Sequence, residues 1–314
     1  MKILVAILMI IGLLFCAGCD SDPLPTTIDQ PTAWKAQSSG TTQVLLGVSF
    51  FDNTKGWMSG TAGTILATQD AGITWSTQFS GTTRFIRDIY FSDATTGTCV
   101  GESGLILRTT NAGGTWITQT SGVTEHLTHV YFFNSLVGMA TGQNGTILKT
   151  INGGTTWTKQ TSGVTVEMTC VFMLSETLAV ATGFNGIILR TLDGGITWAS
   201  VPTGITSNLR GVSFNGNNGI AVGLGGKILR SNNAGQTWLS ITTGVTSDLY
   251  AVHFADATFV FVCGTAVIIV SEDGGNDFTY STSPNISGDL YAISMKTGRG
   301  WTVGQNGMVF TYFP

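Results

Sequence analysis

The hydrophobic and polar positions of this chain alternate in short runs, and no long stripe has the spacing of a helix. Runs such as VYF at 130–132 and TILKT at 146–150 are rich in Val, Ile, Thr and aromatic residues, and glycines lie close to them. Short apolar runs between turn residues are typical of β-strands. Ser and Thr are also plentiful, and only 10% of the residues are charged. The pattern therefore predicts an all-β protein.

One segment recurs six times at nearly constant spacing. Its copies are ATQDAGITW at 67–75, RTTNAGGTW at 108–116, KTINGGTTW at 149–157, RTLDGGITW at 190–198, RSNNAGQTW at 230–238 and VSEDGGNDF at 270–278. Their last residues lie 41, 41, 41, 40 and 40 positions apart. A run of the type V-x-F occurs seven times, and each is followed by a turn glycine: Gly60, Gly101, Gly142, Gly183, Gly223, Gly264 and Gly304. Seven structural units are therefore predicted.

Each unit reads as four short strands, and this period with four strands is typical of a β-propeller blade. A blade buries its apolar faces only against its neighbours. The segment TAWKAQSSG at 32–40 matches a fourth strand, whereas GQNGMVFTYF at 304–313 matches a third strand. We therefore predict a seven-bladed propeller over residues 32–314, whose N-terminal strand completes the last blade and removes an open sheet edge.

The first 31 residues have a different composition from the repeats. Residues 1–18 carry one cation and an apolar stretch, as a signal peptide does, and Ala17 and Gly18 precede Cys19. This resembles the bacterial lipoprotein signal, so we expect Cys19 to be lipidated and residues 19–31 to form a flexible tether. The alternatives are an ordinary cleaved signal or a membrane anchor. The expected location is the extracytoplasmic face of a membrane, inner or outer.

Charge and cysteine content exclude several classes of function. The net charge is −4 and the isoelectric point is near 5.2, and the 14 Lys and Arg residues are scattered. A general nucleic-acid binder would carry a basic face. Three cysteines follow the leader, and we expect buried free thiols, with no disulfide scaffold or metal cluster: Cys99, Cys170 and Cys263.

The recurring segment also carries its own turn chemistry. In TINGGTTW, Asn152 can accept a backbone N–H two residues on, Gly153 or Gly154 permits positive φ, and Trp157 supplies an apolar plate. The segment resembles the Asp-box, or BNR repeat, of sialidases, which lies at the propeller periphery. Six equivalent turns argue against a single phosphate loop. The structural Asp-box residues are Asp70, Asn111, Asn152, Asp193, Asn233, Asp273, Trp75, Trp116, Trp157, Trp198 and Trp238.

The complete unit has a closer resemblance. It reads L-x-x-V-x-F, followed by G-x-A-V-G-x-x-G-x-I-L-R-T-x-D-G-G-x-T-W-x-x-Q-x-S-G, and is similar over residues 32–314 to the Ycf48-like family of photosystem II stability and assembly factors. The resemblance implies a seven-bladed propeller without a catalytic role or cofactor. It also implies that an assembling membrane protein binds an arginine patch on the top face, and cyanobacterial members of the family are lipid-anchored.

The expected top face carries the variable positions. The loop that leads into each inner strand and the loop after each turn glycine should share one face, and the first set differs from unit to unit. Two residues before the V-x-F valine, where the family often has arginine, this chain has only Arg87 and Arg210. A partner other than the photosystem is therefore favoured. The candidate binding residues are Arg84, Arg87, Glu125, His126, Glu167, Arg210, Asp248, Tyr250, Asp289 and Tyr291.

Two other functions remain open. A sialidase-like glycoside hydrolase would need three arginines, a tyrosine and acids, but no Arg-Ile-Pro segment occurs and the acids also fit solvated rim charges. Tyr250 and Tyr291 could instead stack on a glycan or anchor a protein. His126 and His129 read as a rim pair and His253 as a channel or core residue, so no metal is expected. We expect a monomeric propeller with no catalytic residues.

Overall fold

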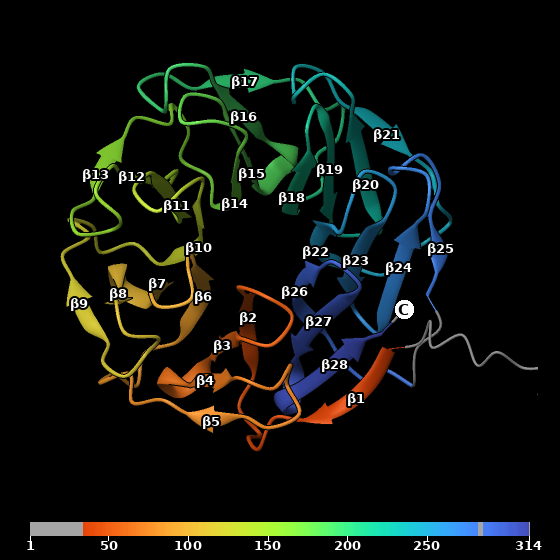
Figure 1. The fold of residues 1–314 in the computed structure, drawn as a ribbon. Coiled ribbons are helices and arrows are strands. Elements are labelled where there is room, and N and C mark those ends of the chain that lie inside the picture. The colour runs from red at the N-terminus through yellow and green to blue at the C-terminus, as the bar shows by residue number, and fades with distance from the viewer. Residues whose placement is uncertain (1–33, 282–284, 314) are drawn as a thin grey trace, which may run out of the picture. The chain divides into compact units, whose positions relative to one another are not determined.

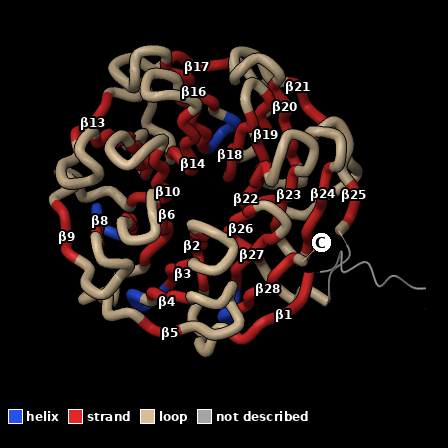
Figure 2. Tube along the Cα trace, in the orientation of Figure 1, coloured by secondary structure: helices blue, strands red, loops and turns tan. Residues whose placement is uncertain are grey.

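The computed structural model describes residues 34–281 and 285–313, which form a ring of seven sheets around a central channel (Figure 1). Each sheet has four antiparallel strands, so the predicted seven-bladed propeller is confirmed. Loops and four short 3-10 turns make up most of the rest (Figure 2). Among the described residues, no helix is long and apolar enough to cross a membrane. The expected signal peptide, Cys19 and tether lie outside the described residues.

We number the blades 1 to 7 in the order of their inner strands. The inner strands are β2 (Leu45–Phe50), β6 (Ile86–Phe91), β10 (Leu127–Phe132), β14 (Met168–Met173), β18 (Leu209–Asn215), β22 (Leu249–Phe254) and β26 (Leu290–Lys296). The second strands are β3 (Gly56–Gly60), β7 (Gly97–Gly101), β11 (Gly138–Gly142), β15 (Ala179–Gly183), β19 (Asn218–Gly223), β23 (Val260–Gly264) and β27 (Arg299–Gly304).

The outer half of each blade completes the sheet. The third strands are β4 (Ile65–Thr68), β8 (Ile106–Thr109), β12 (Ile147–Thr150), β16 (Ile188–Thr191), β20 (Lys227–Ser231), β24 (Val267–Ser271) and β28 (Met308–Tyr312). The fourth strands are β5 (Ser76–Thr77), β9 (Ile117–Gln119), β13 (Thr158–Gln160), β17 (Ala199–Val201), β21 (Leu239–Ile241), β25 (Thr279–Tyr280) and, in blade 7, β1 (Trp34–Ser38). The 3-10 turns are η1 (Thr61–Gly63), η2 (Glu102–Gly104), η3 (Phe184–Gly186) and η4 (Gln305–Gly307).

The ring is closed by the N-terminal strand, as predicted. β1 runs antiparallel to β28, with Trp34 opposite Tyr312 and Ser38 opposite Met308. Trp34 is 1% exposed and lies 6.0 Å, centroid to centroid, from Phe261 of blade 6. The closing strand therefore contributes both a hydrogen-bonded edge and a large apolar side chain to the contact between two blades.

The core lies between the blades rather than at the centre of the ring. The rings of Phe50 in blade 1 and Trp301 in blade 7 stack 3.5 Å apart, and Phe91 and Trp57 repeat this contact at 3.4 Å between blades 2 and 1. Space is so short here that a Cβ on Gly56 would lie 2.4 Å from the ring of Phe50. The glycine that begins this second strand is therefore required by packing.

The Asp-box turns lie between the third and fourth strands, at the outer edge of the ring (Figure 1). In blade 3, Thr150 Oγ1 donates to Asn152 Oδ1 at 3.0 Å and accepts the N–H of Gly154 at 2.9 Å. Asn152 Oδ1 accepts the N–H of Thr156 at 2.9 Å. The sequence predicted that Asn152 accepts an N–H two residues further along the chain. That prediction is wrong, because Asn152 accepts the N–H four residues further along and so closes the whole turn. Trp157 packs edge-to-face on Phe132 at 5.9 Å.

Candidate functional site

Seven side chains at equivalent positions meet at one mouth of the channel, and we call them the mouth ring. Each is the second residue of an inner strand, and together with Glu167 they line one void of about 140 Å³. The ring comprises, from blade 1 to blade 7, Leu46, Arg87, Thr128, Thr169, Arg210, Tyr250 and Tyr291. These are the seven positions two residues before the V-x-F valine, so the structure brings together Arg87, Arg210, Tyr250 and Tyr291 from the candidate set.

A β-bulge explains how these side chains reach the channel. In all seven blades the register between the inner and second strands shifts by one residue just here, for example between Ile86 and Asp88 in blade 2. Successive side chains of a regular strand point to opposite faces, and a bulge breaks that alternation. Arg87 and Asp88, which are neighbours in sequence, therefore both line the channel.

The two arginines of the mouth ring have few protein partners. Both are half-buried, and the Nε atom of each is buried without a hydrogen-bond partner. Among the described residues, neither forms an ion pair with a carboxylate. The guanidinium of Arg210 lies over the ring of Phe184 at 4.9 Å. Arg84 differs, because its Nη1 donates to the carbonyl oxygens of Glu102 and Ser103 at 3.4 and 3.3 Å.

The other polar members of the mouth ring are already engaged. Thr128 Oγ1 donates to the carbonyl of Met168 at 2.6 Å, and Thr169 Oγ1 to that of Leu209 at 2.9 Å, each across to the next blade. The Tyr291 hydroxyl donates to Asp289 Oδ2 at 3.1 Å, and its ring lies 5.3 Å from that of Tyr250. The mouth therefore has arginines on blades 2 and 5 and an aromatic pair on blades 6 and 7.

Most of the candidate rim residues hold neighbouring blades together, and we call His126, Glu167, Asp248 and Asp289 the rim latches. Each directly precedes an inner strand and accepts a hydrogen bond from the turn of the preceding blade. His126 Nδ1 accepts the N–H of Ser103 at 2.9 Å, and Asp248 Oδ1 accepts the N–H of Gly225 at 2.8 Å.

The remaining rim acids are also engaged. Asp289 Oδ1 accepts the Thr265 hydroxyl at 2.7 Å, and Glu167 Oε2 accepts the Gln143 amide at 3.4 Å. Glu125 forms a 3.8 Å ion pair with Lys159. The acids are therefore partly solvated rim charges that are also hydrogen-bonded or ion-paired. These latches also place the two sets of loops on one face, as expected.

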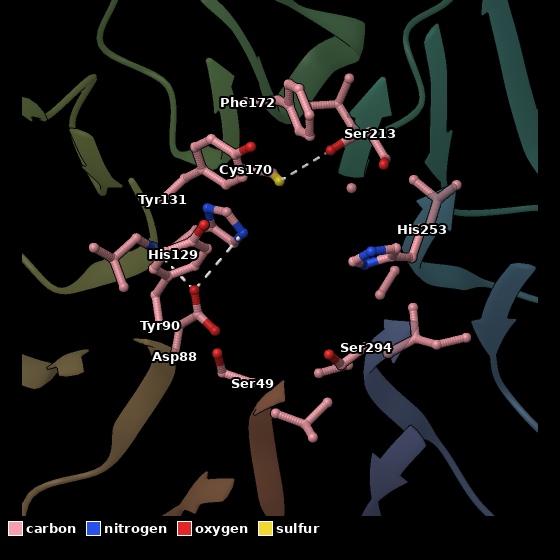
Figure 3. Close-up of a pocket in the computed structure, with 18 of the residues that line it drawn as sticks. Ser49, Asp88, Tyr90, His129, Tyr131, Cys170, Phe172, Ser213, His253 and Ser294 are labelled. Atoms are coloured by element: carbon pink, nitrogen blue, oxygen red, sulfur yellow. Dashed lines mark hydrogen bonds and ion pairs between the residues drawn. The ribbon is translucent and has the colours of Figure 1, made fainter. Parts of the chain in front are cut away.

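Below the mouth, the channel wall is polar on three adjacent blades. Asp88, His129 and Cys170 occupy the position after the mouth ring on blades 2, 3 and 4 (Figure 3). His129 Nε2 lies 3.7 Å from Asp88 Oδ2, which also accepts the N–H of Val130 at 2.9 Å. Burial lowers the pKa of His129, but the neighbouring Cys170 and Asp88 raise it to a net value of about 9. The remaining blades have only glycine or alanine at this strand position: Gly47, Gly211, Ala251 and Ala292.

Two residues further along the inner strands, the channel wall has aromatic rings on one side and polar side chains on the other. The rings of Tyr90, Tyr131 and Phe172 follow one another at 5.3 and 4.7 Å, opposite His253 (Figure 3). Burial and the charge of Lys296 lower the pKa of His253 to about 4. The prediction that His126 and His129 form a pair at the rim is wrong. His126 lies at the rim, but the bulge turns His129 into the channel.

Sequence reasoning missed the Asp88–His129–Cys170 cluster. The three residues stand 41 positions apart in one column of the repeat, and that column could have pointed to them. Cys99 and Cys263 belong to second strands, so neither shares this repeat position with Cys170. All three cysteines are buried free thiols.

Comparisons with known proteins agree with this architecture. The family described as photosynthesis system II assembly factor YCF48 matches residues 27–117 and 80–163. A solved structure of YCF48 bound to D1 peptide has a TM-score of 0.75 at 20% identity and covers 90% of this chain and 95% of its own. YCF48 from Cyanidioschyzon merolae gives 0.73 at 20% identity, covering 90% and 99%.

A more distant propeller has the same fold. The WD40 propeller domain of Doa1 has a TM-score of 0.72 at 14% identity, covering 88% of this chain and 96% of its own. No curated protein matches the sequence. The resemblance to the Ycf48-like family predicted from the repeat is thus confirmed over residues 27–163, and the solved structures show the same fold.

Proposed function

We propose that this Ycf48-like propeller is a non-catalytic scaffold that binds a segment of a partner protein at the mouth ring. One observation carries the proposal: Arg87 and Arg210 are half-buried at the mouth with no acidic partner among the described residues, although the rim is rich in acids. Guanidinium groups recognise carboxylates through paired hydrogen bonds. The solved structure of YCF48 with a D1 peptide supports a peptide ligand for this fold.

The mouth ring suggests the chemistry of the bound segment. An acidic side chain or a terminal carboxylate suits the arginines of blades 2 and 5. An apolar or aromatic side chain suits Tyr250 and Tyr291, since tyrosine is enriched among residues that dominate binding. The partner we propose is a membrane or envelope protein, because the leader predicts an exported chain anchored through Cys19.

Crosslinking and pull-down from membranes would test this proposal. The double variant Arg87→Gln/Arg210→Gln should lose capture of the partner by about tenfold or more, since a charge-assisted hydrogen bond contributes about 1.5–3 kcal/mol. Lys35→Gln is the matched control, because Lys35 is an exposed cation on β1, which is the outermost strand of blade 7, whereas the mouth ring lies on the inner strands. Undiminished capture by the double variant would reject the site.

The tyrosine pair keeps an envelope glycan as the second candidate ligand. Stacked or tilted aromatic rings at a cavity mouth can pack on sugar faces, and the two rings lie 5.3 Å apart. A glycan would lose affinity in Tyr250→Ala/Tyr291→Ala but keep it in the arginine variant. Hydrolysis of a sialoside or β-glucan, abolished by substituting a rim carboxylate, would favour an enzyme instead.

A further inference from the structure

The Asp88–His129–Cys170 cluster combines a thiol with two groups that can activate it. His129 lies between the carboxylate of Asp88 and the thiol of Cys170 (Figure 3). The N–H of Val130 fixes Asp88 Oδ2 at 2.9 Å, and the N–H of Val171 lies 3.4 Å from His129 Nδ1. A carboxylate that orients an imidazole beside a sulfur is a recurrent arrangement for nucleophilic cysteines.

The charge of His129 supports such a role. Although burial lowers its pKa, Cys170 and Asp88 raise it to about 9, so the ring is protonated at neutral pH. A positive ring beside a sulfur stabilises the negative charge that the sulfur carries when it attacks. Positively charged surroundings with partial exposure distinguish reactive cysteines from structural ones.

The three cysteines differ in their access to the channel. Cys170 is 6% exposed and lines the channel, whose volume is about 410 Å³. Cys99 and Cys263 are 0% exposed and do not line it. Burial raises the pKa of Cys263 to about 12 and that of Cys99 well above its usual range. Cys99 and Cys263 are therefore internal controls for Cys170.

We propose that Cys170 is a reactive thiol that small hydroperoxides oxidise from within the channel. The sulfur attacks one peroxide oxygen, and the S–O bond forms as the O–O bond breaks. The protonated ring of His129 gives a proton to the leaving oxygen, which departs as water or an alcohol, and the ring then takes up the proton of the thiol, so that His129 ends protonated as it began. The sulfur is oxidised by two electrons to the sulfenic acid, and the peroxide is reduced by two.

The channel determines the size of the oxidant and the lifetime of the product. A small neutral peroxide can pass the mouth ring, whereas a second protein that carries a thiol is too large to enter the channel. Cys99 and Cys263 lie on second strands of blades 2 and 6, and neither reaches the channel to form a disulfide with Cys170. The sulfenic acid therefore persists until a small external thiol reduces it.

Trapping the sulfenic acid in the folded chain would test the proposal. The full chain is treated with hydrogen peroxide and dimedone, and the modified cysteine is identified by peptide mass spectrometry. We expect the adduct on Cys170 and none on Cys99 or Cys263, and after Cys170→Ser we expect none on any cysteine within residues 34–313. His129→Gln should slow the reaction by at least about tenfold. His253→Gln, which changes the other channel histidine, should leave the rate unchanged.

Two results would overturn the proposal. One is an adduct that appears only after unfolding in urea, or equally on all three cysteines. The other is a rate that does not change in His129→Gln while circular dichroism shows the native fold. If that variant does not fold, native wild-type protein still decides the matter, because Cys170 must react with iodoacetamide at least about ten times faster than Cys99 and Cys263.

Discussion

The Asp-box turns and the channel-facing positions of the inner strands repeat in opposite ways. In the turns, the same hydrogen bonds recur with the same residue types, as Thr68 with Asp70 and Thr191 with Asp193 show at 2.7 and 2.8 Å. On the inner strands, the backbone and its bulge recur in every blade, but the side chains differ from blade to blade. The constant turn residues at the periphery therefore stabilise the ring, whereas the variable side chains at the mouth determine what the ring can bind.

The largest effect should come from the periphery. Trp34 holds the repeat position of Trp75, so Trp34→Ala tests the aromatic wedge of the strand that closes the ring. Because Trp34 is 1% exposed, we expect a loss of about 3–5 kcal/mol in the free energy of unfolding. Urea denaturation measures it, with the 73% exposed Leu239→Ala as control. Equal losses in the two variants would show that ring closure contributes little.

The turn itself can be tested in blade 3. Thr150→Ala removes the hydroxyl that donates to Asn152 Oδ1 and accepts the buried N–H of Gly154, so we expect a loss of about 1–3 kcal/mol in the free energy of unfolding. Thr158→Ala, on the exposed face of β13, should change it by less than about 0.5 kcal/mol. Partner capture should be normal in both variants. Impaired capture in Thr150→Ala alone would mean that the periphery and the mouth are coupled.

The two channel histidines should give opposite dependences of stability on pH. The folded pKa of His129, about 9, lies above its ordinary 6.5, so its stabilisation is complete below about 6.5 and is lost as the pH rises towards 9. The folded pKa of His253, about 4, lies below 6.5, so stability is lost as the pH falls from 6.5 towards 4.

Variants assign each loss to its histidine. Thermal denaturation across this range should show a weaker alkaline loss in His129→Gln and a weaker acid loss in His253→Gln. Ring resonances in NMR titrations report the two pKa values directly. Resonances that both titrate near 6.5 would contradict the two environments described for the channel wall.

The smallest effect concerns acid and the Asp-boxes. Hydrogen bonds from Thr74 and Thr197 lower the pKa of Asp70 and of Asp193 to about 2, so their contribution is present above about 4 and is lost as the pH falls towards 2. Asn152 makes the same contact, donating from Nδ2 to Thr156 Oγ1 at 2.8 Å. Asp70→Asn/Asp193→Asn should therefore keep the fold and reduce the drop in melting temperature between pH 5 and pH 2. If the drop in melting temperature is unchanged, residues other than Asp70 and Asp193 cause the acid sensitivity.

Much of the ring could be predicted from the sequence because its signals are local and repeated. The period, the V-x-F runs and the unmatched strands at the two ends were enough for seven blades and their closure. The rim latches could not be predicted, because the N–H that Asp248 accepts belongs to the turn of another blade. Alternation along a strand would also direct Asp88 away from the channel if Arg87 faces it, and only the bulge reverses this.

The pairing of β1 with β28 also determines when the ring can close. The ribosome makes β1 first among the described strands and β28 last, and the hydroxyl of Ser39 donates to the carbonyl of Gly307 across 268 residues at 2.7 Å. Blades 1 to 6 can form while the chain is still being made, but blade 7 must wait for strand β28. Contacts this distant in sequence form slowly, so ring closure follows the formation of blades 1 to 6.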